Sequence, residues 1–387
     1  MSSQPSQSTK SHRTPRMVTQ NGYPMESHKV TTDDGYVLNV HRLPHPDRIG
    51  VVFLMHCMFC SSAEYVCLGR GKALAYLLHD AGYDVWMGNA RGNTYSRGHL
   101  KYNPDLKKFW DFTWHHIGMY DVPAMIDYAL NITGEKRLHY VGHSQGTTAF
   151  FVMASQRPSY NSKIISMQAM APIAFMSHCK SPFVRLAVSV LPFLQNLANI
   201  FGVREFLSSS AWLTATSGML CKDTAWTQAV CTAILNFVGG YNAAQLNSTN
   251  LPFIFSNTPA GGSVDLLFHY GQLVNSGKFR QFDYGEEKNM IEYKSKEPPE
   301  YDLSKISAPV VLYWSMNDWL SDPKDVDILM TKLTNLAATY LIEDVDWSHF
   351  DYTWGNDANT MVYQNIIETI RRYSKTNKQK YTNMTLT

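Results

Sequence analysis

The sequence predicts an α/β protein with a mostly parallel central sheet and an inserted, mainly helical segment. Short runs of β-branched and other apolar residues alternate with segments of helical spacing. This alternation is typical of a parallel sheet that is covered by helices on both faces. It stops between about residues 175 and 301, which indicates an insertion. A G-x-S-x-G sequence, Gly142 to Gly146, lies directly between a predicted strand and a predicted helix.

The predicted elements follow one another in a regular order. Asp34-Gly35, between VTT and YVLNVHRLP, is a hairpin signal near the start of the ordered chain. Apolar and β-branched runs predict strands, and helical spacing of Leu, Ala and Ile predicts helices. The predicted strands are residues 51–55, 83–87, 138–141, 164–169 and 310–314, and the predicted helices are residues 72–81, 121–130, 147–155 and 360–373.

The domain organisation follows from this alternation of predicted strands and helices. Residues 21–174 and 303–374 are predicted to form two parts of one core, and residues 175–302 to form a cap inserted between them. Two helix-like pieces, 183–201 and 224–238, lie within the cap. Residues 1–20 and 375–387 are predicted to be polar, disordered tails. No apolar run reaches the length of about 18 residues that a membrane-spanning helix needs.

Composition excludes some functions and leaves the location open. The chain is 17% charged with a net charge of +2, and it has no dense Lys/Arg block outside its tails, which argues against nucleic-acid binding. Six cysteines are too few for a disulfide scaffold but allow one or two bridges. The first twenty residues lack the apolar core of a secretory signal, whereas the sequons at Asn131, Asn247 and Asn383 are compatible with secretion and glycosylation.

Ser144 is the predicted nucleophile. It is the central residue of Gly142-His143-Ser144-Gln145-Gly146, between the strand LHYV and the helix that begins near Thr147. Glycines on both sides of such a tight turn remove Cβ atoms that would clash. The N-terminus of the following helix favours negative charge that develops at the serine.

A serine nucleophile needs a base and an orienting acid, and in this arrangement they follow in the order Ser, Asp, His. Asp318 lies in the loop after the strand PVVLYW and is the predicted acid. The competitor Asp322 precedes Pro323 and a helical pattern, which is typical of a helix N-cap. His349 is the predicted base because it is the only histidine after His269.

With these residues in place, the chain resembles the acid lipase family that includes gastric and lysosomal lipases, and in particular its insect members. The resemblance extends from about Gly22 to Tyr373 and rests on long stretches. These are GYPMESHKVTTDDGYVL, LAYLLHDAGYDVWMGNARGNTYSRGH, FWDFTWHHIGMYDVPAMIDY, VGHSQGTTAF, PAGGSVDLLFHYGQLVNSGKFRQFDYG and HFDYTWG.

The resemblance implies an α/β-hydrolase fold with a cap and hydrolysis of neutral lipid esters, triacylglycerols or sterol esters, at a lipid–water interface. It implies that the backbone N–H groups of Met58 and Gln145 form the oxyanion hole. It also implies a cap disulfide between Cys221 and Cys231, no cofactor or metal, and a secreted or lysosomal location. Two alternatives stay open, a catalytically silent lipid carrier on this fold and a soluble esterase or thioesterase.

Cys57 and Cys60 form a C-x-x-C in the loop after the strand at residues 51–55. The setting lacks the further ligands of a zinc site and the thioredoxin-like context of a redox dithiol. We therefore predict two buried thiols at positions where the family has small residues, usually glycine. Glycine adopts positive φ more easily than cysteine does and lets substrate approach the backbone. Cys57 is therefore expected to crowd the acyl-binding side, and Cys57→Gly is expected to raise kcat/KM on long-chain esters.

Overall fold

The computed structural model describes residues 13–201, 204–206, 226–242, 244–246 and 250–384. Within these residues the strands are β1 (Glu26–Thr31), β2 (Tyr36–Leu43), β3 (Gly50–Met55), β4 (Tyr83–Met87), β5 (Gly98–His99), β6 (Leu138–His143), β7 (Ile164–Met170), β8 (Glu205–Phe206), β9 (Gly262–Ser263), β10 (Val310–Trp314) and β11 (Leu336–Leu341). The α-helices before β10 are α1 (Thr14–Gln20), α2 (Leu74–Asp80), α3 (Trp114–His116), α4 (Val122–Thr133), α5 (Gln145–Gln156), α6 (Pro182–Phe201), α8 (Trp226–Gly239), α9 (Leu251–Asn257), α10 (Val264–Ser276) and α11 (Glu286–Glu292). Those after it are α12 (Pro323–Lys332), α13 (Asp351–Trp354) and α14 (Gln364–Met384), and the short 3₁₀ helix η1 (Ser62–Tyr65) follows β3.

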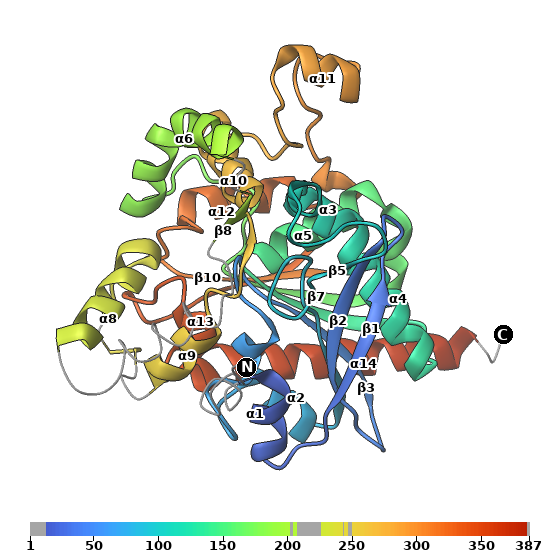
Figure 1. The fold of residues 1–387 in the computed structure, drawn as a ribbon. Coiled ribbons are helices and arrows are strands. Elements are labelled where there is room, and N and C mark those ends of the chain that lie inside the picture. The colour runs from blue at the N-terminus through green and yellow to red at the C-terminus, as the bar shows by residue number, and fades with distance from the viewer. Residues whose placement is uncertain (1–12, 202–203, 207–225, 243, 247–249, 385–387) are drawn as a thin grey trace, which may run out of the picture.

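A twisted central sheet organises the molecule (Figure 1). Its order is β1-β2-β4-β3-β6-β7-β10-β11, with β5 paired to β2. β2 is antiparallel to its neighbours, and every pair from β4 to β11 is parallel. The predicted fold class is therefore confirmed. Since parallel strands end at the same edge, the loops after β3, β6, β10 and β11 meet at one edge of the sheet.

Two apolar cores lie on opposite faces of this sheet because side chains alternate along each strand. In β3, Val52 and Leu54 pack into the core that α1, α2 and α14 cover. Phe53 and Met55 point to the other core, which α4 and α5 cover. Strands buried on both faces explain the continuous apolar runs of the sequence.

Both predicted tails differ from the structure. The prediction that residues 1–20 are a disordered tail is wrong for Thr14–Gln20, which form α1 with a proline in its first turn and with Met17 and Val18 buried. Apolar side chains of α1 complete the core beneath α2, so this segment is ordered. At the other end, α14 continues to Met384, so residues 375–384 are helical rather than disordered.

The chain between β7 and β10 contributes the helices α6 and α8–α11 and the small β8–β9 sheet. The predicted helical pieces at 183–201 and 224–238 correspond to α6 and α8, which lie on the same side of the molecule (Figure 1). Helices α6 and α8 contact one another, and α6 also contacts α10. Among the described residues, no helix has the length and apolar character needed to cross a membrane.

Candidate active site

Ser144 lies in the sharp turn between β6 and α5. Its φ of +51° falls in the left-handed region, which is costly for a residue with a side chain. Glycines make the turn possible, because a Cβ on Gly146 would lie 2.1 Å from the Met55 carbonyl oxygen and one on Gly142 would lie 2.7 Å from the Gly146 backbone. The two glycines therefore let backbone pack directly on backbone around the serine.

The three predicted triad residues meet at the carboxyl edge of the sheet. His349 Nε2 lies 2.8 Å from Ser144 Oγ, and His349 Nδ1 lies 2.9 Å from Asp318 Oδ2. Because a carboxylate accepts, Nδ1 carries the proton and Nε2 is free to accept from the serine hydroxyl. The exposed fractions are 6% for Ser144 and 1% for both Asp318 and His349, so the bonds are shielded from bulk water.

Asp318 is held by its own loop. Its Oδ1 accepts hydrogen bonds from the backbone N–H groups of Leu320 and Ser321 at 2.9 and 2.8 Å. Its competitor Asp322 is the N-cap of α12 and accepts from the Lys324 N–H at 2.9 Å. The structure thus brings Asp318, and not Asp322, to His349.

The loop after β3 is held by the side chain of His56. His56 Nε2 accepts from the Ala90 N–H at 3.1 Å, so Nδ1 carries the proton and donates to the Cys57 carbonyl oxygen at 2.7 Å. Burial lowers the pKa of His56, which favours this neutral form. The carbonyl belongs to the peptide group whose N–H is that of Met58, so His56 fixes the orientation of that N–H.

The strained residue of this loop is Phe59 and not Cys57. Phe59 has a φ of +56°, and its carbonyl oxygen accepts from the Ala260 N–H. The Phe59 ring packs on Phe206 with centroids 4.9 Å apart. The expectation that Cys57 occupies a position suited to positive φ is therefore wrong, since it is Phe59 that takes the left-handed conformation.

The prediction of two buried thiols in the C-x-x-C is also wrong, because Cys57 and Cys60 form a disulfide. The loop turns back on itself, with the Cys60 N–H donating to the Cys57 carbonyl oxygen at 3.2 Å and the Cα atoms 5.3 Å apart, within bridging distance. Both residues are buried, as predicted. Cys67 and Cys179 are free.

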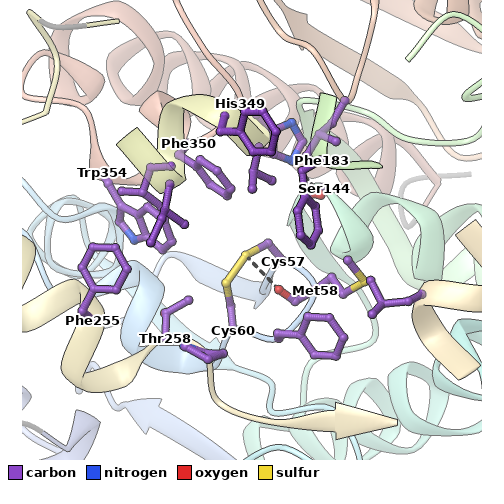
Figure 2. Close-up of a pocket in the computed structure, with 18 of the residues that line it drawn as sticks. Cys57, Met58, Cys60, Ser144, Phe183, Phe255, Thr258, His349, Phe350 and Trp354 are labelled. Carbon is purple, nitrogen blue, oxygen red and sulfur yellow. Dashed lines mark hydrogen bonds between the residues drawn. A yellow bond between two sulfur atoms is a disulfide. The ribbon is translucent and has the colours of Figure 1, made fainter. Parts of the chain in front are cut away.

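A cavity of about 760 Å³ opens beside the nucleophile. Figure 2 shows Ser144, His349 and Phe183 grouped on one side, with Phe255 and Trp354 on the other and the disulfide near the centre. The wall is almost entirely apolar and includes Ala233, Ile234, Leu235, Phe237, Val238, Leu267 and Leu320. A smaller cavity of about 120 Å³, lined by residues of α6 and α10, also borders Ser144 and Met58. The arrangement can hold an extended apolar chain with its polar end at Ser144.

Comparisons with known proteins agree with this geometry. Residues 14–69 match the family model described as a partial alpha/beta-hydrolase lipase region, and residues 50–197 match the alpha/beta hydrolase fold. The chain is 43% identical to Lipase 3 of Drosophila melanogaster, with 92% of each chain covered. The chain belongs to the acid lipase family of α/β-hydrolases. It is 38% identical to gastric triacylglycerol lipase of Rattus norvegicus and 36% identical to human lysosomal acid lipase/cholesteryl ester hydrolase, each over 91% of this chain and 90% and 89% of theirs.

Two polar residues of this family member were not predicted from the sequence. Glu64 and His143 are buried side by side between the loop after β3 and the predicted triad, with exposed fractions of 3% and 0%. A signal was present for Glu64, which is the only charged residue between Arg48 and Arg70. A lone acidic residue in an apolar run is buried only with strong partners.

The Cys57 sulfur, a carboxylate oxygen of Glu64 and a ring nitrogen of His143 lie within 4.8 Å of one another, a grouping that resembles a metal site. The Cys57 sulfur, however, is bonded to Cys60, and both His143 nitrogens have hydrogen-bond partners in the protein. The group is thus a hydrogen-bonded network.

Four further predicted residues concern modification. Asn131 is exposed on α4, where a glycan would have access. Cys221, the side chain of Cys231 and Asn247 lie outside the described residues. Both the cap disulfide and glycosylation stay predictions.

Proposed function

We propose that this chain is a serine ester hydrolase that acts on neutral lipids, with Ser144 as nucleophile, His349 as general base and Asp318 as orienting acid. The observation that carries the proposal is the 2.8 Å contact between His349 Nε2 and Ser144 Oγ at the end of an apolar cavity. The order Ser, Asp, His in the sequence supports the triad. The relatives' names support hydrolysis of lipid esters.

The reaction proceeds in two acyl-transfer steps. His349 takes the Ser144 proton as the hydroxyl oxygen attacks the ester carbonyl, and Asp318 stabilises the resulting imidazolium. The backbone N–H groups of Met58 and Gln145 hold the oxyanion. The ester C–O bond then breaks as the imidazolium gives its proton to the departing alkoxide oxygen, which leaves as the alcohol. Water then cleaves the acyl-enzyme by the same route.

The substrates are triacylglycerols or sterol esters, the two classes named among the relatives. The apolar wall of the larger cavity suits an acyl chain, and the absence of charged groups from its described lining disfavours small polar esters. Residues 175–302 act as a cap over this cavity. Apolar side chains of α6 and α8, including Leu186, Phe193 and Ile234, are more than half exposed and would meet a lipid–water interface.

The location that goes with this function is outside the cell or in the lysosome. The gastric and lysosomal relatives support it, and so does the exposed sequon at Asn131. An oxidising compartment would also preserve the Cys57–Cys60 disulfide.

The test is labelling with a fluorophosphonate probe, which reacts only with an activated serine, followed by assays on emulsified triolein and cholesteryl oleate. Wild type is expected to label and to hydrolyse at least one of the emulsions, and Ser144→Ala is expected to do neither. Labelling with turnover of p-nitrophenyl acetate alone would favour a soluble esterase. Folded wild type that does not label would favour a silent lipid carrier and overturn the proposal.

A further inference from the structure

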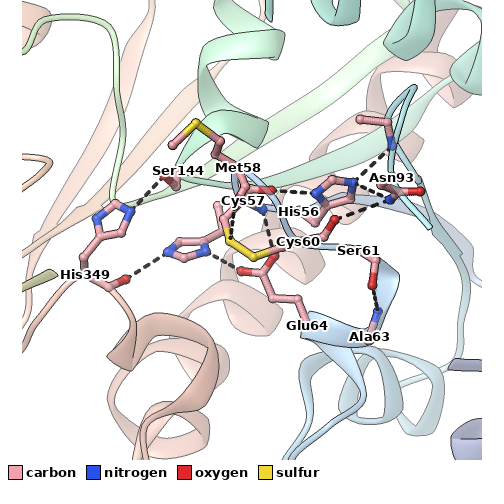
Figure 3. The surroundings of a disulfide bond; sticks show 12 residues. His56, Cys57, Met58, Cys60, Ser61, Ala63, Glu64, Asn93, Ser144 and His349 are labelled. Atoms are coloured by element: carbon pink, nitrogen blue, oxygen red, sulfur yellow. Dashed lines mark hydrogen bonds and ion pairs between the residues drawn. A yellow bond between two sulfur atoms is a disulfide. The ribbon is translucent and has the colours of Figure 1, made fainter. Parts of the chain in front are cut away.

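Glu64 connects the oxyanion loop to the catalytic base through a chain of hydrogen bonds (Figure 3). Its Oε2 accepts from the Cys57 N–H at 2.8 Å, and its Oε1 is hydrogen-bonded to His143 Nδ1. His143 Nε2 in turn donates to the carbonyl oxygen of His349 at 3.0 Å. These hydrogen bonds thus join the loop after β3, the last residue of β6 and the loop after β11.

Each end of this chain lies next to a group that takes part in the proposed reaction. The Cys57 N–H precedes the peptide N–H of Met58, a proposed oxyanion donor. His143 directly precedes Ser144, and the accepting carbonyl belongs to His349 itself. Glu64 is therefore one hydrogen bond from the oxyanion loop and two from the base, without touching substrate.

The proton positions follow from what each atom can do. A carbonyl oxygen only accepts, so His143 Nε2 carries a proton. One further proton lies between His143 Nδ1 and Glu64 Oε1, whichever of the two atoms holds it. Placing a carboxyl group and an imidazole in the interior costs free energy unless all their bonds are made, and a buried pair is weak support for stability alone.

We infer that Glu64 is a positioning residue, which sets the relative placement of the Met58 N–H, Ser144 and His349 through its hydrogen bonds to Cys57 and His143. This inference rests on the proposed function, because the three placed groups are the proposed oxyanion donor, nucleophile and base. The hydrogen bonds of Glu64, rather than its volume or its charge, determine the turnover rate.

Two variants similar in size to Glu64 distinguish the effect of its hydrogen bonds from the effects of its volume and its charge. In Glu64→Gln the amide oxygen can accept from the Cys57 N–H, and the amide NH₂ can donate to a neutral His143 Nδ1. Glu64→Leu keeps the approximate volume and removes both bonds. The assay is hydrolysis of soluble p-nitrophenyl butyrate, with active sites counted by the fluorophosphonate probe so that kcat is expressed per reactive Ser144.

Glu64→Leu is expected to lower kcat per active site by about 100-fold, the scale of an ångström misplacement, with KM changed by less than about twofold. Glu64→Gln is expected to stay within about threefold of wild type. A merely structural role would instead reduce the fraction of labelled protein and leave kcat per labelled site unchanged, which would overturn the inference. An equal loss of kcat in both variants would also overturn it, because charge would then be the determining property.

If Glu64→Leu does not fold, Glu64→Asp serves in its place, since its carboxyl group is retracted by one methylene and cannot keep both contacts. Wild-type kcat in folded Glu64→Asp overturns the inference, and a loss of at least about tenfold at unchanged KM supports it. If wild type labels and is active while the variant is unaffected, the inference is overturned and the proposed function stands. Folded wild type that neither labels nor turns over would overturn the proposed function and the inference with it.

Discussion

Asp351 gives a pH-dependent prediction whose sign can be worked out from the structure. Its side chain is fully buried beneath the loop of His349, where Oδ2 accepts from the Ser348 N–H at 2.6 Å and from Asn242 Nδ2 at 3.1 Å. Its Oδ1 has no hydrogen-bond partner among the described residues. Burial raises the pKa of Asp351 from 3.8 to about 7.

Between pH 4 and 7 the folded protein therefore holds a proton on Asp351 that the unfolded chain has lost. The contribution of this group to the free energy of unfolding is greatest below pH 4 and falls as pH rises, by about 1.4 kcal/mol per pH unit, until about pH 7. Asp351→Asn keeps an oxygen that can accept both bonds and removes the titration. The stability of wild type relative to the variant is thus expected to fall by about 3 kcal/mol between pH 5 and pH 8.

The assay is urea unfolding of both proteins, followed by tryptophan fluorescence at pH 5 and pH 8. The difference between the two proteins must be used, because burial lowers the pKa values of His41, His115 and His139 to about 3. Unfolding lets these histidines take up protons below about pH 6.5, which destabilises both proteins alike as pH falls. Asp346→Asn, at an exposed position of the same loop, is the matched control. A difference between wild type and Asp351→Asn that stays constant or grows with pH would refute the reasoning.

Two other predictions concern the catalytic loops. Cys57→Gly/Cys60→Ala removes both sulfur atoms from the cavity wall. It is expected to raise the ratio of kcat/KM on long-chain esters to kcat/KM on butyrate by about threefold to tenfold. An unchanged or lower ratio would count against crowding by this loop. Asp318→Asn is expected to lower kcat by about 10⁴-fold at little cost in stability. Asp322→Ala is expected to keep its kcat and to lose about 1 kcal/mol of stability, because the N-cap of α12 is lost. Reversal of these two outcomes would exchange the roles of the aspartates.

The three residues of the proposed triad could be predicted because each depends on a local signal. Ser144 is marked by glycines whose missing Cβ atoms permit the turn, and the structure places backbone atoms where those Cβ atoms would be. Asp322 is marked as an N-cap by the proline and the helical pattern that follow it, which left Asp318 as the acid. The parallel sheet then brings the loops to one edge regardless of their separation in the chain.

The state of the C-x-x-C could not be predicted in the same way. The spacing fits a bridge, a pair of thiols or half of a metal site, and only the path of the loop distinguishes them. That path depends on non-local contacts, since His56 binds the Ala90 N–H and Phe59 binds the Ala260 N–H. Segments from two other parts of the chain thus hold the turn in which Cys57 and Cys60 meet.

Glu64 shows both what a sequence reveals and what it leaves undetermined. An isolated acidic residue in an apolar run must find partners, because an unpaired buried carboxylate is too costly to keep. That requirement is visible in the sequence. The identity of the partners is not, since His143 is separated from Glu64 by 79 residues and from His349 by 206. Local signals therefore locate each proposed catalytic group, while the placement of these groups to within a fraction of an ångström depends on long-range hydrogen bonds. These are the bonds that the Glu64→Leu and Glu64→Gln variants test.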